Sequence, residues 1–127
     1  MIDIKDFLVN ILKDRIDPNI SLHTGRQDEE KSLLILNNNN QSNFKLYNQS
    51  YFKQNIQIVI NWNDNYTETR QKALEIYNVI SNINEVEYDE HTMIINCLMV
   101  DDFPQDNTNN SKIYSQRFNF QIRYIVF

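Results

Sequence analysis

The chain has 127 residues, a mass of 15.3 kDa and a formal charge of −5 at pH 7. Its length predicts a single domain over residues 1–127 that can bury a core, and its one cysteine excludes a disulfide within the chain. A hydrophobic content of 41% excludes a disordered protein, and no apolar run approaches the about 18 residues of a membrane span. The acidic start lacks the basic lead of a signal peptide, so we expect a soluble protein of a reducing compartment with no membrane partner. The excess of acids argues against a protein that coats DNA.

The first predicted element is a helix that runs from the start of the chain to Asp17-Pro18. Its apolar residues recur at three- and four-residue spacing on one face: Ile4, Phe7, Leu8, Ile11 and Leu12. We predict Asp3 as the N-cap, because a side-chain oxygen there can accept a free backbone amide. Proline should stop the helix, since it donates no amide hydrogen and restricts the residue before it.

Extended segments are predicted next. Residues 19–23 are expected to form a strand that leads to a turn at Gly25, and residues 32–36 to form a second short strand. The chain contains 20 asparagines, which we attribute to AT-rich codon usage, and residues 37–43 are expected to form a polar loop. Residues 44–52 place large aromatic side chains among Asn, Gln and Ser, and are expected to form an irregular strand or a long arm.

A strand and a second helix are predicted in the middle of the chain. Isoleucines alternate with other residues over 56–62, which predicts a strand with one strongly apolar face. Residues 63–65 break this strand and can cap a helix that begins after them. Apolar residues at helical spacing then predict a helix over 66–83.

The last third predicts two paired strands. Residues 93–100 are apolar on both faces except for Asn96, which favours a central strand. Residues 114–126 alternate as a half-buried strand and should pair with 93–100 around an exposed polar loop over 101–111. The predicted fold class is α+β, a largely antiparallel sheet with two helices packed on one face and with long loops and an arm.

Few residues suggest catalysis. With one glycine, no phosphate-binding loop can be written. Cys97 lies in an apolar strand and is expected to be a small buried side chain, while His23 and His91 lie in separate segments without metal-ligand spacing. We therefore expect a protein that is not an enzyme, with no catalytic, cofactor-binding or metal-binding residues.

Two acidic groups suggest a metal site. The three aspartates of residues 101–106 can attract a hard cation, but their loop lacks the glycine and the closing glutamate of an EF-hand, so a solvated loop tip is preferred. Glu29-Glu30-Lys31 contains the E-x-K step of restriction-type metal-dependent nucleases. Such nucleases also need an upstream acid, and Asp17 at the helix stop is the candidate.

Two surfaces suggest a binding partner. Five basic residues lie among aromatics, as in proteins that bind single strands of nucleic acid, although a solvated sheet face is the preferred interpretation: Lys45, Lys53, Lys112, Arg117 and Arg123. The segment 44–52 exposes aromatic side chains that a monomer rarely leaves unpaired, and such arms commonly add to a neighbour's sheet edge. The candidate partner or oligomer interface is Phe44, Tyr47, Tyr51 and Phe52.

Four stretches in chain order give the chain a family resemblance. They are the opening helix 2–12, the strand 55–60 that runs through 64–66 into the helix 68–80, the strand 93–100, and the closing strand 114–122. In this pattern the chain resembles the small phage minor capsid or tail-terminator proteins of head–tail gene clusters. It departs from them where relatives often carry Gly and Pro, over 37–53, and where they carry an Arg after the middle strand, since Trp62 stands there.

The resemblance implies an α+β subunit of a homo-oligomeric, sixfold ring in a virion or tail-like particle, assembled in the host cytoplasm. The ring would cap the head-proximal end of the tail tube and stop its growth. The implied partners are the tail tube protein and the sheath and neck or connector proteins. DNA would only pass through the lumen, and in a headless contractile tail no DNA would be involved. A closed ring needs head-to-tail contacts between copies, and the family carries no catalytic motif.

Three alternative functions stay open. A head-completion or stopper protein of the neck is not separated from a terminator by composition. A small metal-dependent nuclease would depend on Glu29 and Lys31. A monomeric binding module would present the aromatic arm without self-association.

Overall fold

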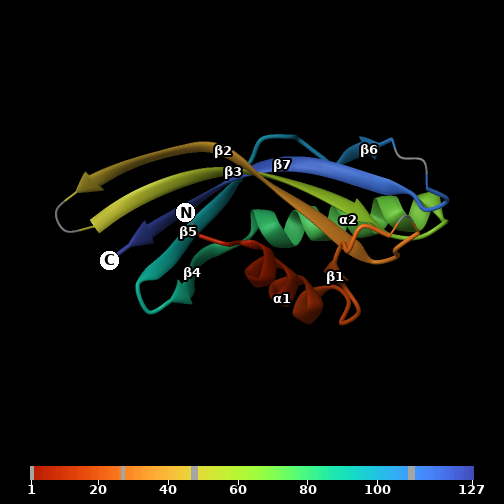
Figure 1. Cartoon of the computed structure of the whole chain (residues 1–127), viewed down its shortest axis with the longest axis horizontal. Helices are drawn as coiled ribbons and strands as arrows, with labels where there is room; N and C mark the ends of the chain where they lie inside the picture. The colour runs from red at the N-terminus through yellow and green to blue at the C-terminus, as the bar shows by residue number, and fades with distance from the viewer. Residues whose placement is uncertain (1, 27, 47–48, 109–110) are drawn as a thin grey trace.

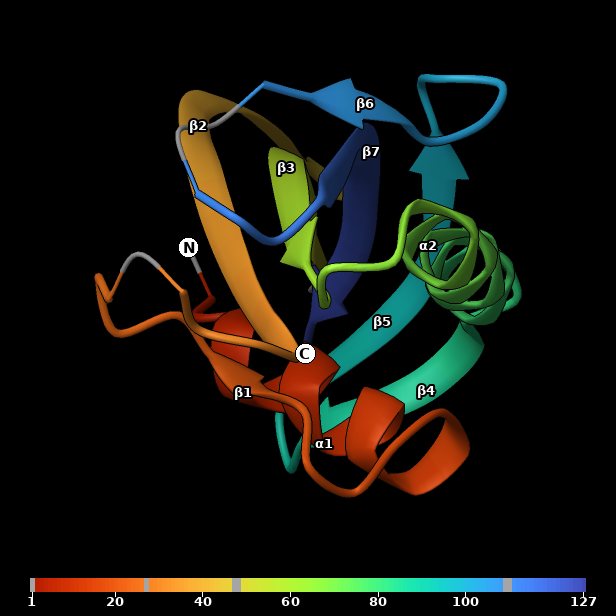
Figure 2. The same ribbon diagram turned by 90° about the vertical axis from the view of Figure 1, so that its right-hand side faces the viewer.

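A curled sheet of seven strands wraps around two helices in the computed structural model, which describes residues 2–26, 28–46, 49–108 and 111–127, and for 38–46 the backbone alone. The elements in chain order are α1 (Lys5–Arg15), β1 (Ser21–Leu22), β2 (Ser32–Leu46), β3 (Gln49–Asn61), α2 (Tyr66–Ser81), β4 (Asn84–Asp89), β5 (Thr92–Met99), β6 (Gln105–Asn107) and β7 (Ser115–Val126). The strand order is β1-β2-β3-β7-β5-β4, with β6 beside β7, and only β1 and β2 pair in parallel. Both helices lie on the concave side of the sheet (Figures 1 and 2), so the predicted α+β class is confirmed.

Helix α1 starts one residue later than its predicted cap requires. The N-cap is Ile4, and Asp3 accepts the amide hydrogen of Lys5 through Oδ1 at 3.1 Å. The prediction of Asp3 as N-cap is therefore wrong by one residue, because the carboxylate closes a turn before the helix instead of capping it. The helix ends at Arg15, just ahead of Asp17-Pro18 as predicted.

Helix α2 follows its predicted caps closely. The side chain of Asn65 accepts the amide hydrogen of Glu68 at 3.0 Å, which satisfies one free donor of the first turn. The helix ends at Ser81, two residues before its predicted end. One face is buried, with four residues: Thr69, Ala73, Ile76 and Ile80.

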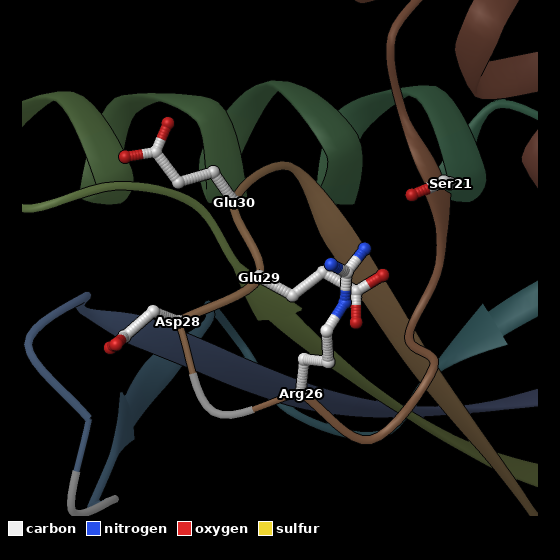
Figure 3. Close-up of a pocket in the computed structure, with 5 residues that line it drawn as sticks. All are labelled: Ser21, Arg26, Asp28, Glu29 and Glu30. Atoms are coloured by element: carbon white, nitrogen blue, oxygen red, sulfur yellow. The ribbon is translucent and has the colours of Figure 1, made fainter.

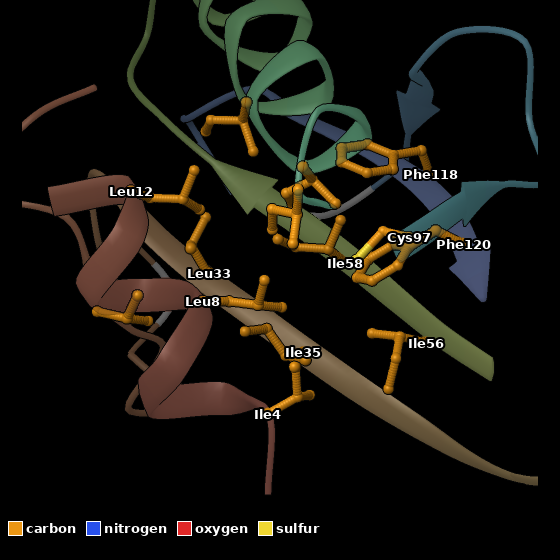
Figure 4. Close-up of a cluster of buried hydrophobic side chains, with 14 of the residues drawn as sticks. Ile4, Leu8, Leu12, Leu33, Ile35, Ile56, Ile58, Cys97, Phe118 and Phe120 are labelled. Carbon is orange, nitrogen blue, oxygen red and sulfur yellow. The ribbon is translucent and has the colours of Figure 1, made fainter. Parts of the chain in front are cut away.

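The core fills the space between the helices and the concave face of the sheet (Figure 4). The N-cap Ile4 and, within α1, Leu8 and Leu12 meet the β2 side chains of Leu33 and Ile35. Under α2 the core continues into strands β3, β5 and β7 with Ile58, Cys97, Phe118 and Phe120. Fully burying a side chain of this size contributes about 1.5–3 kcal/mol, so this face supplies most of the driving force for folding.

Strand β2 extends through the segment that the sequence predicts to be a loop. Its backbone pairs with β3 at Asn38 opposite Asn55 and again at Gln41 opposite Gln54, with a register shift between them. The predicted polar loop over 37–43 is therefore wrong. Backbone pairing does not depend on an apolar side chain, so a polar segment joins the sheet when its partner strand is already held.

The predicted arm over 44–52 belongs to two strands. Residues 44–46 close β2 and residues 49–52 open β3, and Figure 1 shows both strands reaching past the helices. Here β3 also pairs with β7, from Ser50 opposite Val126 onward. Residues 44–46 and 49–52 are thus part of the sheet, so the strand alternative is confirmed for them and the long arm is wrong, while residues 47 and 48 lie outside the described residues.

The last third follows its prediction with two additions. The predicted pairing of the last two long strands is confirmed as β5 with β7. Two strands are not predicted by the sequence pattern. β4 makes β5 second from the edge, and β6 lies inside the predicted loop over 101–111 and pairs with the start of β7.

Candidate functional site

The predicted interface residues divide between the two faces of the sheet. Phe52 lies on the helix side and stacks on Tyr124, with ring centroids 5.0 Å apart and an interplanar angle of 12°. Tyr51 lies on the opposite side, and its hydroxyl donates to Oε1 of Gln49 at 2.9 Å. The backbone of Phe44 pairs opposite Tyr51, whereas Tyr47 lies outside the described residues. The expectation of a uniformly exposed aromatic stretch is wrong for Phe52, because it packs against the core.

The outer face of the sheet is polar and carries basic residues. We use this name for the side away from the helices, formed by alternate residues of β3 and β7. Lys53 lies opposite Arg123, and Asn55 lies opposite Gln121, whose Nε2 donates to Asn55 Oδ1 at 3.4 Å. Neither β3 nor β7 contains an acidic residue.

Three of the five predicted basic residues share this outer face. Arg117 pairs opposite Val59 and so joins Lys53 and Arg123 on the same side of the sheet. Lys112 is exposed in the loop before β7. Only the backbone of Lys45 is described, and it lies in β2 opposite Ser50. The sheet therefore gathers Lys53, Arg117 and Arg123, but spreads them along most of the length of β7.

β2 and β4 each leave a stretch of strand edge open among the described residues, and we call these two stretches the open edges. β1 pairs with β2 at Ser32 and Leu33 alone, so from residue 41 to residue 46 the second side of β2 meets no strand within the described residues. β4 pairs with β5 on one side, and its other side likewise meets no strand of the described part. Open strand edges are the usual place where a second chain adds to a sheet.

A hydrogen-bonded loop cluster surrounds Glu29. The carboxylate of Glu29 accepts from the backbone amide and the hydroxyl of Thr24, at 2.8 Å and 2.9 Å, and it lies 3.1 Å from His23 Nδ1. The bond from the Thr24 amide is the main cause that lowers the pKa of Glu29. His23 Nδ1 also lies 3.2 Å from Ser32 Oγ, so one ring nitrogen meets both the acid and the hydroxyl. A Ser-His-acid triad needs one ring nitrogen for each, so this cluster closes a loop and does not form a triad.

An open depression of roughly 620 Å³ adjoins this cluster (Figure 3). Arg26 and Glu29 point toward one another there, whereas Asp28 and Glu30 point outward. The carboxylates thus do not converge on one point. Within the described part of the chain, no group of three or more His, Cys, Asp or Glu residues is arranged to hold a metal ion.

The residues of the nuclease alternative fall into two separate networks. Asp17 Oδ2 lies 2.9 Å from Lys31 Nζ, so the fold does bring these two together. The pKa of Asp17 is lowered chiefly by the backbone amide of Asn19 and then by Lys31. Lys31 also lies over the ring of buried Trp62, 5.8 Å from its centroid. Glu29 instead bonds to Thr24, so the two acids do not share one site.

The aspartates of residues 101–106 fasten a loop to the body of the protein. Asp101 Oδ2 accepts from the backbone amide and the side-chain amide of Asn119, at 2.7 Å and 3.0 Å. Asp106 Oδ1 accepts from the hydroxyl of Tyr66 at 2.9 Å, which raises the pKa of that tyrosine. The predicted solvated loop tip is wrong for Asp101, which is half-buried and bonded to β7, whereas Asp106 is exposed although it accepts a bond from Tyr66. Asp102 is exposed.

Helix α2 holds the same loop through side chains that the sequence analysis did not select. Arg70 donates to the carbonyl of Pro104 and, at 2.6 Å, to Oε1 of Gln116, and it lies over the ring of Phe103 at 5.6 Å. Tyr77 donates to the carbonyl of Asp101 at 2.6 Å. Gln116 is completely buried at a position where the alternation predicts an apolar residue, and this mismatch is the signal that points to the contact.

The remaining singled-out residues have no chemical neighbours that suggest catalysis. Cys97 is buried, and burial raises the pKa of its thiol to about 12, so it stays protonated and packs as a small apolar side chain as predicted. His91 is exposed between β4 and β5, and its carbonyl accepts the amide hydrogen of Phe127 at 2.8 Å.

Comparison with known proteins gives no further assignment. No family model matches the chain, and no curated protein matches it. Among the described residues, neither helix is long and apolar enough to cross a membrane.

Proposed function

We propose that the chain is a structural assembly protein of a phage tail or tail-like particle, and that it acts as a tail terminator. In this function several copies close into a ring on the head-proximal end of the tail tube. One face of the ring matches the last layer of tube subunits, and the other face offers them no matching surface. Tube growth stops because the next subunit finds no partner.

The observation that carries this proposal is the one-sided construction of the sheet. Both helices cover the concave face, while the outer face carries no helix, and the open edges at β2 and β4 meet no further strand of the described residues. A ring subunit needs two different lateral surfaces and two different axial surfaces. The open edges can provide the first pair. The resemblance of the sequence to tail-terminator proteins supports the same function.

The proposal also accounts for the charge of the chain. A formal charge of −5 suits a ring whose lumen lets DNA pass without binding it. The partners in this proposal are the tail tube protein and the sheath and neck proteins. No reaction is proposed for this protein, and the loop cluster around Glu29 has a structural role in it.

The test is to co-express the chain with a tail tube protein from the same genome and to measure tube lengths in negative-stain images. We expect shorter tubes, each with additional density at one end, than the tube protein forms alone. A matched control is the Ile58→Ala variant, whose core is damaged while its surface residues are unchanged. Equal tube lengths with and without the wild-type chain, and bare tube ends, would contradict the proposal.

A further inference from the structure

Residues of the two open edges lie in the same cross-strand rows. A row here is the line of directly opposite residues that runs across successive paired strands. Successive register partners join Phe44 to Tyr51, Ile125, Met93 and finally Glu87. Other rows run from Asn43 to Val86 and from Lys45 to Asp89 in the same way. Residues 41–46 of β2 and the six residues of β4 thus stand at opposite ends of shared rows (Figure 2 shows the two strands on opposite sides of the curled sheet).

This placement determines the relative direction of the two edge strands when one copy joins the next. Four antiparallel steps separate β2 from β4, so the two edge strands run in the same direction. A contact between β4 of one copy and β2 of the next therefore continues the sheet as a parallel pair. When the joined residues share rows, each copy adds no step along the strands. A head-to-tail contact gives a ring when its rotation closes and a helical filament when it does not, and a contact within shared rows adds no shift along the strands that would oppose closure.

The charges of the two edges are complementary. β4 contains three acids and no base, and Glu90 follows it directly. The whole of β2 contains one charged residue, Lys45, and the adjoining part of β3 adds Lys53. Opposite charges across paired strands stabilise the pair, and like charges destabilise it. An edge of one copy is thus attracted to the other edge of the next copy.

The same features disfavour contacts between identical edges. Two β4 edges would place acids against acids. β4 departs from a regular strand, with a φ of 50° at Glu85 and a register shift between Glu87 and Asp89, which limits the length over which any second strand can pair with it. The strand is nevertheless held in place, since Tyr88 donates to the carbonyl of Asp3 at 2.9 Å and its ring lies 5.6 Å from that of Phe7.

We infer that a second copy of this chain docks on each edge, with β4 of one copy lying against residues 41–46 of β2 of the next. The inference rests on the proposed function, in which copies close a ring, and it names the subunit junction of that ring. The junction is heterologous, and its repeat joins the open part of β2 in each copy to β4 of a neighbouring copy.

Disulfide trapping tests the junction. Glu87→Cys in one copy and Phe44→Cys in the next would face each other across about 4.8 Å, which is within the reach of a disulfide. Lys45→Cys with Asp89→Cys is a second pair in a neighbouring row that leaves every aromatic side chain in place. The matched control pairs Glu87→Cys with Leu34→Cys, on the same edge strand but about 30 Å away along it. The native Cys97 is buried and protonated, so it does not compete.

Each mixture is oxidised with and without tail tubes and is then examined on a denaturing gel. We expect linked dimers as the main product of both row-matched mixtures and none from the control. A chain that carries both members of a pair should give a ladder that ends at one ring size. Row-matched pairs that link no more than the control would overturn the inference. If the wild-type chain then still shortens tubes, the terminator function stands without this junction. If the pairs link but tube lengths do not change, the junction stands and the terminator function fails.

Discussion

The two faces of the sheet are built from the same strands, yet they serve different purposes. On the concave face, Ile58 and Phe118 are completely buried under the helices. On the outer face, Gln57 and Arg117 occupy the adjacent positions and are half-buried without a covering helix. The contrast teaches that the concave face determines whether the chain folds, while the outer face and the edges are free to meet other molecules.

The largest expected effect comes from a substitution in the core on the concave face. Ile58→Ala removes a completely buried side chain beside Phe118 and Phe120, so we expect a loss of about 2–5 kcal/mol in the free energy of unfolding. The matched change on the outer face, Gln57→Ala, should cost less than about 0.5 kcal/mol. Urea unfolding followed by circular dichroism measures both. Equal losses would contradict the division between the faces.

The second prediction concerns two neighbouring aromatic residues near the start of β3. Phe52→Ala removes the ring that stacks on Tyr124, and we expect it to cost about 2–3 kcal/mol of unfolding free energy because Phe52 is only partly buried. Tyr51→Ala, on the outer face, should cost less than about 1 kcal/mol. Chemical denaturation midpoints of the two variants give the comparison. A larger loss of unfolding free energy for Tyr51→Ala would mean that Tyr51, and not Phe52, packs against the core.

A third effect concerns the loop that α2 holds by polar contacts. Arg70→Ala leaves the completely buried Gln116 without the guanidinium, and we expect a loss of about 1–3 kcal/mol with faster amide hydrogen exchange over residues 101–107. Lys72→Ala, on the same helix but away from that loop, is the control. Exchange rates over the loop that do not change in Arg70→Ala would remove the proposed role of this arginine.

The smallest expected effect is a dependence on pH. Hydrogen bonding from Asn19 and the charge of Lys31 lower the pKa of Asp17 in the folded state. The stabilisation is thus complete at neutral pH and is lost as the pH falls below the ordinary carboxyl range of about 4. Because the pair is partly exposed, we expect it to contribute about 0.5 kcal/mol. The stability difference between the wild type and Asp17→Asn should therefore shrink between pH 7 and pH 3. A difference that grows instead would mean that folding raises, and does not lower, the pKa of Asp17.

The concave face is also the part of the fold that the sequence predicts well. Helix spacing identifies α1 and α2, and strict alternation identifies the core of β3 and most of β7, since burial on one face forces those patterns. The second half of β2 could not be predicted in this way. Its Asn-rich segment has no apolar period, and it becomes a strand because β3 pairs with it. In β4, Val86 and Tyr88 give a two-residue period that is short and interrupted by acids.

The candidate site is less accessible to sequence reasoning. Phe44 and Tyr51 can be selected as large aromatics in a polar context, but the side of the sheet on which each lies depends on the register with β7. That Glu87 shares a row with Phe44 depends on four strand pairings in succession. Such a relation between residues far apart in the chain is a property of the assembled sheet and has no local signal.

The most direct test of the account is the mass of the assembly by light scattering behind a sizing column. We expect a closed ring for the wild type and a monomer for Glu87→Lys with Asp89→Lys, since basic residues would then stand on both edges and Lys45 would face a lysine in its own row. Lys45→Glu with Lys53→Glu should give a monomer as well, and the chain with all four changes should form the ring again, because its charges are exchanged but still complementary. A wild type that stays monomeric with and without tail tubes, or four proteins of equal mass, would contradict the account.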